Sequence, residues 1–370
     1  MLPYACLGVA CAGLLYLVLA LLIKLVGVKK VMKFFPPVVT GPIIIAIGLC
    51  LAPSALNNCA TCWPLAVVAL VIVIFFNIWG RGMAKIIPIL LGVVGAYLFA
   101  LIFGNGLGLL GETGQVDVKA IADAAWIGLP VHMDETIFSI DWNNSSAIIF
   151  AITTMVPIAI ATMMEHIGDI CAISATVGKD FINSPGLHRT LIGDGVATAF
   201  AGAIGGPANT TYGENTGVLE LSKVYDPRVI RIAAVFAIIL SFIPKFSSVI
   251  STMPTAIIGG ISFMLYGMIS AIGVRNVVEN KVDLTKSRNL IIAGVIFVCG
   301  LGFGGGLTFT IGGTSITLTA LAIAAIAGIL LNAILPGNDY EFGKNPAGDS
   351  SRGVYVMNTD SEKEESEDNK

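Results

Sequence analysis

The chain has 370 residues and a formal net charge of −3 at pH 7; 55% of its residues are hydrophobic and only 12% are charged. A soluble domain carries about a quarter of charged residues. This composition, with a mean hydropathy of +0.86, therefore excludes a soluble globular protein. We expect an integral membrane protein that is surrounded by the lipid bilayer and has no nucleic-acid partner.

Apolar runs follow one another along the chain, and a helix of about 20 residues is long enough to cross a bilayer. The eleven runs are 2–26, 38–55, 64–79, 86–103, 147–164, 191–204, 213–224, 229–243, 254–272, 289–303 and 315–335. They predict an all-α polytopic membrane protein.

Basic residues lie almost entirely in one set of links between these runs. Of the 21 lysines and arginines, only Lys119 and Lys245 fall in links on the opposite side of the membrane. Links rich in lysine and arginine stay in the cytoplasm. The asymmetry therefore predicts a multi-pass protein of the cell (plasma or inner) membrane with a cytoplasmic C-terminus.

Two polar segments interrupt or follow the apolar runs. Residues 104–146 are acidic, and we expect them to form an outer polar loop that divides the runs into two groups. Residues 336–370 carry nine acids and four bases, a composition typical of a disordered and solvated tail. The only C-x-x-C sequence, Cys59 to Cys62, has no second pair, so we expect no metal site.

Glu165 follows the run 147–164 directly, and Asp169 lies one helical turn later on the same face. An ionised carboxylate at membrane depth costs several kcal/mol, so such a residue usually faces a cavity, a partner or a ligand. Two like charges at this spacing disfavour joint ionisation, which suits one carboxyl to proton exchange. The alternative is a helix end at the cytoplasm, where both acids are solvated. His166 faces another side of the helix, and we expect it to be packed or interfacial.

The sequence Gly-Gly-Pro at 205–207 stops a helix, the threonine-rich residues 208–212 suit an extended segment, and an apolar run restarts near Gly213. Broken helices at membrane depth are tolerated where the freed backbone groups line a cavity, which in transporters marks the substrate site. The restart also presents helix N–H groups that can donate to a ligand oxygen. The alternative is a simple kink.

A second acid, Glu214, lies at this restart beside Asn215. It is a candidate ligand for substrate, although a purely structural helix cap is the alternative because helix N-termini favour acids. Asp194, inside the short run 191–204, is a third buried acid. We expect it to support the site by accepting from backbone donors.

The ten residues 209–218, Asn-Thr-Thr-Tyr-Gly-Glu-Asn-Thr-Gly-Val, resemble the signature of the nucleobase/ascorbate transporter family (nucleobase:cation symporter-2), most closely its bacterial uracil permeases. Ser222 stands where the signature usually has threonine. A second family motif is matched by Glu165-His166-x-Gly168. The resemblance extends from about Leu2 to Leu335.

The resemblance implies a fold of two inverted seven-span repeats with two short broken half-helices. It implies a core domain that holds the substrate, formed by 1–26 and 147–250, and a gate domain formed by 36–103 and 254–335. Family members carry three spans before the one that begins here at Leu2, so we expect an N-terminally truncated form of the fold.

The resemblance also implies the site. Glu165 and Glu214 would hold the base, the Gly213 N–H would donate to a carbonyl, and Tyr212 and Asn215 would support them. Uptake would be coupled to a proton at Glu165 and Asp169, with no other cofactor. The implied substrate is uracil or a related nucleobase; a homodimer is left open.

Three alternatives remain at this point. The first is a xanthine or urate permease, because purine-transporting relatives have an acid where uracil permeases commonly have histidine, and this chain has Asp169. Glu214, by contrast, stands where purine transporters usually have glutamine, and it favours uracil. A truncated chain that no longer transports is the second. An enzyme is the third, and we expect none, because the chain contains neither H-E-x-x-H nor G-x-S-x-G.

Overall fold

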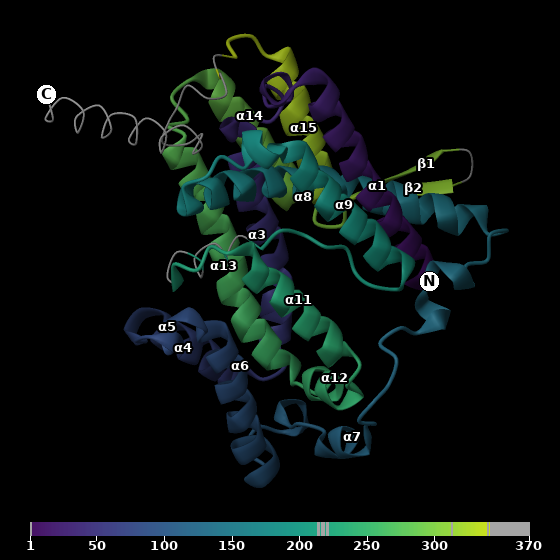
Figure 1. Cartoon of the computed structure of the whole chain (residues 1–370), viewed down its shortest axis with the longest axis vertical. Coiled ribbons are helices and arrows are strands. Elements are labelled where there is room, and N and C mark those ends of the chain that lie inside the picture. The colour runs from purple at the N-terminus through teal and green to yellow at the C-terminus, as the bar shows by residue number, and fades with distance from the viewer. Residues whose placement is uncertain are drawn as a thin grey trace, which may run out of the picture. The chain divides into compact units, whose positions relative to one another are not determined.

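The structure, a computed structural model, describes residues 2–212, 215, 219, 222–311, 314–338 and 340 (Figure 1). The chain forms two compact units. Unit 1 comprises Met1–Cys50, His132–Thr216 and Ile269–Lys370, and unit 2 comprises Leu51–Val131 and Gly217–Met268. Helices α3 and α13 each contribute to both units.

Unit 1 holds α1 (Leu2–Val26), α2 (Val28–Val31), the first part of α3 (Pro37–Ala60), η3 (Met133–Glu135), η4 (Ile137–Ser139), α8 (Ser145–Val177), η5 (Ile182–Gly186), α9 (Leu187–Ala203), the second part of α13 (Thr255–Glu279), α14 (Ser287–Gly302), β1 (Leu307–Ile311), β2 (Thr314–Leu318) and α15 (Ala320–Ile334). Unit 2 holds the rest of α3 and α13, with α4 (Trp63–Trp79), α5 (Met83–Ile86), α6 (Pro88–Phe99), η1 (Ala100–Gly106), η2 (Glu112–Gly114), α7 (Val118–Asp123), α11 (Pro227–Ser241) and α12 (Pro244–Ser251).

The prediction of an all-α polytopic membrane protein is confirmed. Within the described part of the chain, five helical segments are long and apolar enough to cross a membrane: Leu2–Val26, Pro37–Ala60, Pro88–Gly106, Ser145–Cys171 and Thr255–Glu279. Helices α11 and α12 together form a sixth such segment that is bent by 91°. The shorter helices α4, α14 and α15 are also apolar. The inverted repeats and the core and gate domains stay predictions.

Local sequence signals explain where several helices begin. Proline occupies the first helical turn of α4, α6, α11 and α12, where its missing N–H removes no helical hydrogen bond. The Asp226 carboxylate accepts from the Arg228 N–H at the start of α11, and the Thr319 hydroxyl accepts from the Ala322 N–H at the start of α15. Such side-chain caps satisfy N–H groups that have no partner inside the helix.

A β-hairpin, which the sequence did not predict, connects α14 with α15. Strands β1 and β2 pair antiparallel with Leu307 opposite Leu318, and the hydroxyls of Thr308 and Thr317 lie 3.0 Å apart across the strands. The predicted apolar run 315–335 therefore begins as a strand, and its helix starts only at Ala320. β-Branched residues such as threonine favour strands, and apolarity alone does not distinguish such a segment from a helix.

In unit 1, α1 packs against α8 and α9 (Figure 1). Glycines allow the backbones of α1 and α9 to approach closely: a Cβ on Gly13 would lie 2.6 Å from the Gly195 carbonyl oxygen, and one on Gly202 would lie 2.7 Å from the Ala10 nitrogen. Small residues serve this purpose at helix contacts in membranes. The apolar core beside this contact includes Tyr16 and Ile167 and brings α8 next to both helices.

Candidate functional site

Helix α8 carries the first predicted acids. It continues to Val177, past the predicted end at Met164, so Glu165 and Asp169 lie one turn apart within one continuous helix. Asp169 is 4% exposed, and Glu165 is half-buried. Both acids therefore lie against protein rather than at a helix end open to solvent.

The predicted helix break lies directly after α9. The helix ends at Ala203, Gly205 adopts a left-handed φ of 91°, and residues 206–212 form neither helix nor strand. Glycine adopts this backbone conformation without the steric cost that other residues bear. The helix end predicted from the Gly-Gly-Pro sequence is therefore observed, whereas the restart predicted at Gly213 lies outside the described residues. Residues 206–212 are called the break segment below.

The break segment lies against α8 through two adjacent threonines. The Thr210 hydroxyl donates to Glu165 Oε2 at 3.2 Å. The Thr211 hydroxyl oxygen lies 2.9 Å from His166 Nδ1. The carboxylate that the sequence singled out is thus held beside the break segment, and its role in binding a ligand stays a prediction.

His166 is the residue at which most of these elements meet. Its Nε2 lies 3.0 Å from the Thr190 hydroxyl oxygen, and its Nδ1 lies 3.1 Å from Asp194 Oδ2, both on α9. The ring is 4% exposed and contacts the Tyr16 ring of α1 edge-on, with 6.4 Å between the ring centroids. His166 is therefore packed, as predicted, but through polar partners on α9 and the break segment.

The other predicted site residues fall into two groups. Gly213 and Glu214 lie outside the described residues. Tyr212 is 68% exposed, and its carbonyl accepts from the Asn215 N–H at 3.1 Å. Asp194 Oδ2 lies 3.1 Å from His166 Nδ1, and its expected role as an acceptor for backbone donors stays a prediction.

Sequence reasoning gave His166 no part in the site. Its ring partners, Thr190 and Thr211, lie 24 and 45 residues away in the chain. The available signal was Asp194, because a buried acid needs a hydrogen-bonded or oppositely charged partner, and His166 stands beside the other acid of the motif. A search for such a partner would have pointed to this histidine.

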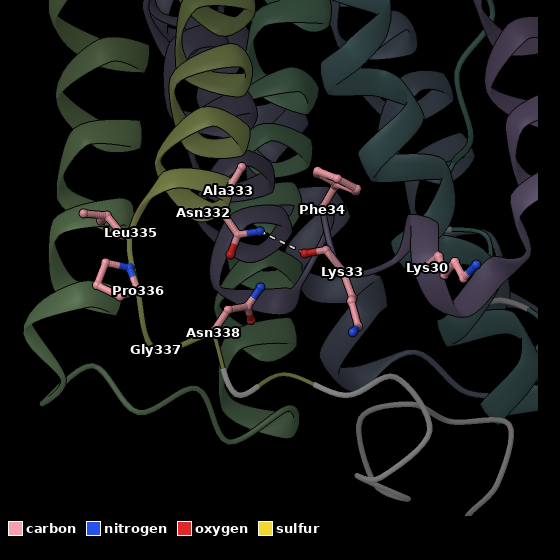
Figure 2. A pocket seen from close by; sticks show the side chains of 9 residues that line it. All are labelled: Lys30, Lys33, Phe34, Asn332, Ala333, Leu335, Pro336, Gly337 and Asn338. Atoms are coloured by element: carbon pink, nitrogen blue, oxygen red, sulfur yellow. Dashed lines mark hydrogen bonds between the residues drawn. The ribbon is translucent and has the colours of Figure 1, made fainter.

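A cavity of about 500 Å³ lies away from these residues, where α2 and α15 end (Figure 2). Lys30, Lys33, Asn332 and Asn338 are among its lining residues, and the Asn332 side-chain amide donates to the Lys33 carbonyl at 2.9 Å. Among the described residues that line it there is no carboxylate, so these residues do not supply the acceptor expected of the predicted site.

The geometry around Glu165 is suited to a ligand that donates hydrogen bonds. A carboxylate has about four lone-pair sites, so Glu165 can accept from a ligand N–H in addition to the Thr210 hydroxyl. Hydrogen bonds of this charge-assisted kind are stronger than those between neutral groups.

Comparisons with known proteins identify the family of this chain and several relatives. The family model described as Permease family (Xan_ur_permease) matches residues 2–306. The uracil permease of Bacillus subtilis (strain 168) is 42% identical over 345 residues, which cover 90% of this chain and 75% of that protein. The uracil permease of Bacillus caldolyticus is 40% identical with the same coverage. The putative pyrimidine permease RutG of Escherichia coli (strain K12) is 36% identical over 332 residues, which cover 89% of this chain and 70% of that protein.

Proposed function

Because this chain belongs to the nucleobase/ascorbate transporter family, we propose that it takes up uracil across the cell membrane by alternating access. The relatives named as uracil permeases support the choice of substrate. The observation that carries the proposal is the Thr210–Glu165 hydrogen bond, which holds a membrane-depth carboxylate against the break segment.

Uracil matches this site chemically. It is neutral and planar, with two N–H donors and two carbonyl acceptors. Glu165 accepts from one ring N–H, and a hydrogen bond to a charged group contributes about 1.5–3 kcal/mol. Glu214 accepts from the base as the second carboxylate, and the Gly213 N–H donates to a carbonyl. Tyr212, at the end of the break segment, and Asn215, which follows it in the chain, support these contacts.

Uptake is coupled to a proton, the only coupling ion in the proposal, and no other cofactor takes part. Glu165 and Asp169 share this role, since two carboxyls one helical turn apart disfavour double ionisation. A proton taken up at this pair accompanies uracil through the transport cycle. Catalysis is no part of the proposed function.

The proposed cycle uses the domains that the family resemblance implies. Residues 1–26 and 147–250 form the core that carries the substrate, and 36–103 and 254–335 form the gate. Residues 104–146 stay on the outer side, and the C-terminal tail, 336–370, stays in the cytoplasm.

A purine substrate, xanthine or urate, is the second candidate. It is favoured by Asp169, because purine-transporting relatives have an acid where uracil permeases commonly have histidine. Glu214 favours uracil at the position where purine transporters usually have glutamine. The two acids therefore point to different bases, and a competition experiment separates them.

The test is uptake of radiolabelled uracil by vesicles that contain the purified chain, with unlabelled uracil, xanthine and urate as competitors. We expect uptake that unlabelled uracil abolishes and that both purines leave unchanged. Inhibition by xanthine or urate at lower concentrations than by uracil would assign the purine function instead. Absence of both uptake and uracil binding by the folded chain would contradict the proposal as a whole.

A further inference from the structure

We propose that His166 is a positioning residue that carries a proton on both ring nitrogens, pairs with the Asp194 carboxylate and fixes the break segment against Glu165. The proton count is inferred from the groups around the ring and is independent of any substrate. Only the expected effect on uracil rests on the proposed function.

The proton on Nε2 follows from its partner, the Thr190 hydroxyl. That hydroxyl has a single hydrogen, which it donates to the Leu187 carbonyl oxygen at 2.9 Å. Its oxygen also lies 3.0 Å from His166 Nε2. A hydroxyl whose hydrogen is already donated can only accept, so the hydrogen between the two atoms belongs to Nε2.

The proton on Nδ1 follows from the acid beside it. Asp194 Oδ2 lies 3.1 Å from Nδ1, and this buried oxygen has no aligned hydrogen-bond donor among the residues that the structure describes. A bare nitrogen lone pair facing a carboxylate oxygen would be repulsive. A protonated Nδ1 instead donates to the Thr211 oxygen at 2.9 Å and places its positive charge beside Asp194.

The charges around the ring balance within this pair. Among the described residues, the titratable groups in contact with His166 are Asp194 from α9 and the Tyr16 ring from α1, and Glu165 precedes it on α8. A buried ion is stable only when it is paired and hydrogen-bonded. An imidazolium ring supplies Asp194 with a counter-charge, whereas a neutral ring would leave this carboxylate without one.

The same ring positions the carboxylate that is proposed to bind substrate. His166 contacts Thr211, and the adjacent Thr210 donates to Glu165. Fixing Thr211 therefore aims the Thr210 hydroxyl at Glu165 Oε2.

The first test is solid-state NMR of the membrane-reconstituted full chain with ¹⁵N-labelled histidine rings, at neutral pH and without uracil. The chain has three histidines, so His132→Gln and His188→Gln together leave His166 as the only signal. We expect two protonated ring nitrogens. A spectrum with one unprotonated nitrogen would overturn the proposal, whether or not the chain transports anything.

Asp194→Asn is the matched variant in the same experiment. Without the counter-charge, the ring is expected to lose one proton and to show one unprotonated nitrogen. Two protonated nitrogens in this variant would reject the pairing with Asp194. Asp194→Glu, which restores the carboxylate, is expected to restore the second ring proton, and its failure to do so in a folded protein would also count against the pair.

The functional test separates positioning from general stability. His166→Gln is expected to raise the KM for uracil about tenfold with a smaller change in maximal rate, because Glu165 loses its fixed orientation. Adding Asp194→Asn to His166→Gln is expected to recover thermal stability relative to the single variant, since no unpaired carboxylate remains. A single variant with wild-type KM, or a double variant less stable than the single one, would contradict the role of His166.

Discussion

At the residue scale, the Thr210 hydroxyl orients Glu165 through one hydrogen bond of 3.2 Å. Thr210→Val has nearly the same shape and lacks the donor. A hydrogen bond to a charged group contributes about 1.5–3 kcal/mol, so we expect the KM for uracil to rise about tenfold or more. Thr210→Ser keeps the hydroxyl and is expected to behave like the wild type. Equal KM values for the valine and serine variants, measured by uptake, would contradict this role.

Glu165→Gln addresses the proposed proton coupling at the same scale. Glutamine can still accept a hydrogen bond, but it cannot take up a proton. We expect uptake that no longer increases with an imposed inward proton gradient, together with weaker uracil binding. The measurement is initial uptake rate in vesicles with and without the gradient. If uptake by this variant still increased with the gradient, Glu165 would not be the group that couples uptake to the proton.

At the element scale, the contact between α1 and α9 depends on glycine at a specific position. A Cβ on Gly195 would lie 2.7 Å from Tyr16 Cβ and 2.8 Å from the Gly13 carbonyl oxygen. Overpacking of this kind costs about 1–3 kcal/mol. Gly195→Ala is therefore expected to lower the thermal unfolding temperature of the purified protein, and to disturb the helix that carries Asp194.

Gly193, on the same helix, provides the control. A Cβ at this position would meet no atom within 4 Å. Alanine is a better helix former than glycine by up to about 1 kcal/mol, so Gly193→Ala is expected to leave the unfolding temperature unchanged or raise it slightly. If both alanine variants unfold at the same temperature, close packing of α1 on α9 does not limit stability.

Some elements could be predicted from the sequence and others could not. The break after α9 was predictable because Gly205 and Pro207 impose local backbone constraints. The hairpin β1–β2 was not, because the residues from 315 are apolar enough to resemble the start of a span. The partners of His166 were not predictable either, since hydrogen bonds across 24 and 45 residues depend on how α8, α9 and the break segment pack.

At the scale of the whole molecule, the distribution of basic residues predicts the orientation in the membrane, and unit 2 explains one of its two exceptions. The Lys245 ammonium group donates to the carbonyl oxygens of Ile121, Ala122 and Ala124 at 3.2, 2.9 and 3.0 Å, and lies 5.0 Å from the Trp126 ring centroid. It thus binds the carbonyl groups at the end of α7, as lysines near helix C-termini do. Lys245 therefore has a structural role that does not depend on sidedness.

The orientation itself is testable by cysteine labelling in intact cells. In a variant without the seven native cysteines, Ser361→Cys places a thiol in the tail and Glu112→Cys places one in the outer polar loop. Links rich in basic residues stay in the cytoplasm, so a membrane-impermeant maleimide is expected to label position 112 in intact cells and position 361 only after permeabilisation. Labelling of position 361 in intact cells, and of position 112 only after permeabilisation, would show the opposite topology. The proposed uptake uses a proton gradient directed into the cell. In a protein with the opposite topology, the proton would therefore reach Glu165 and Asp169 from the other end of the transport path.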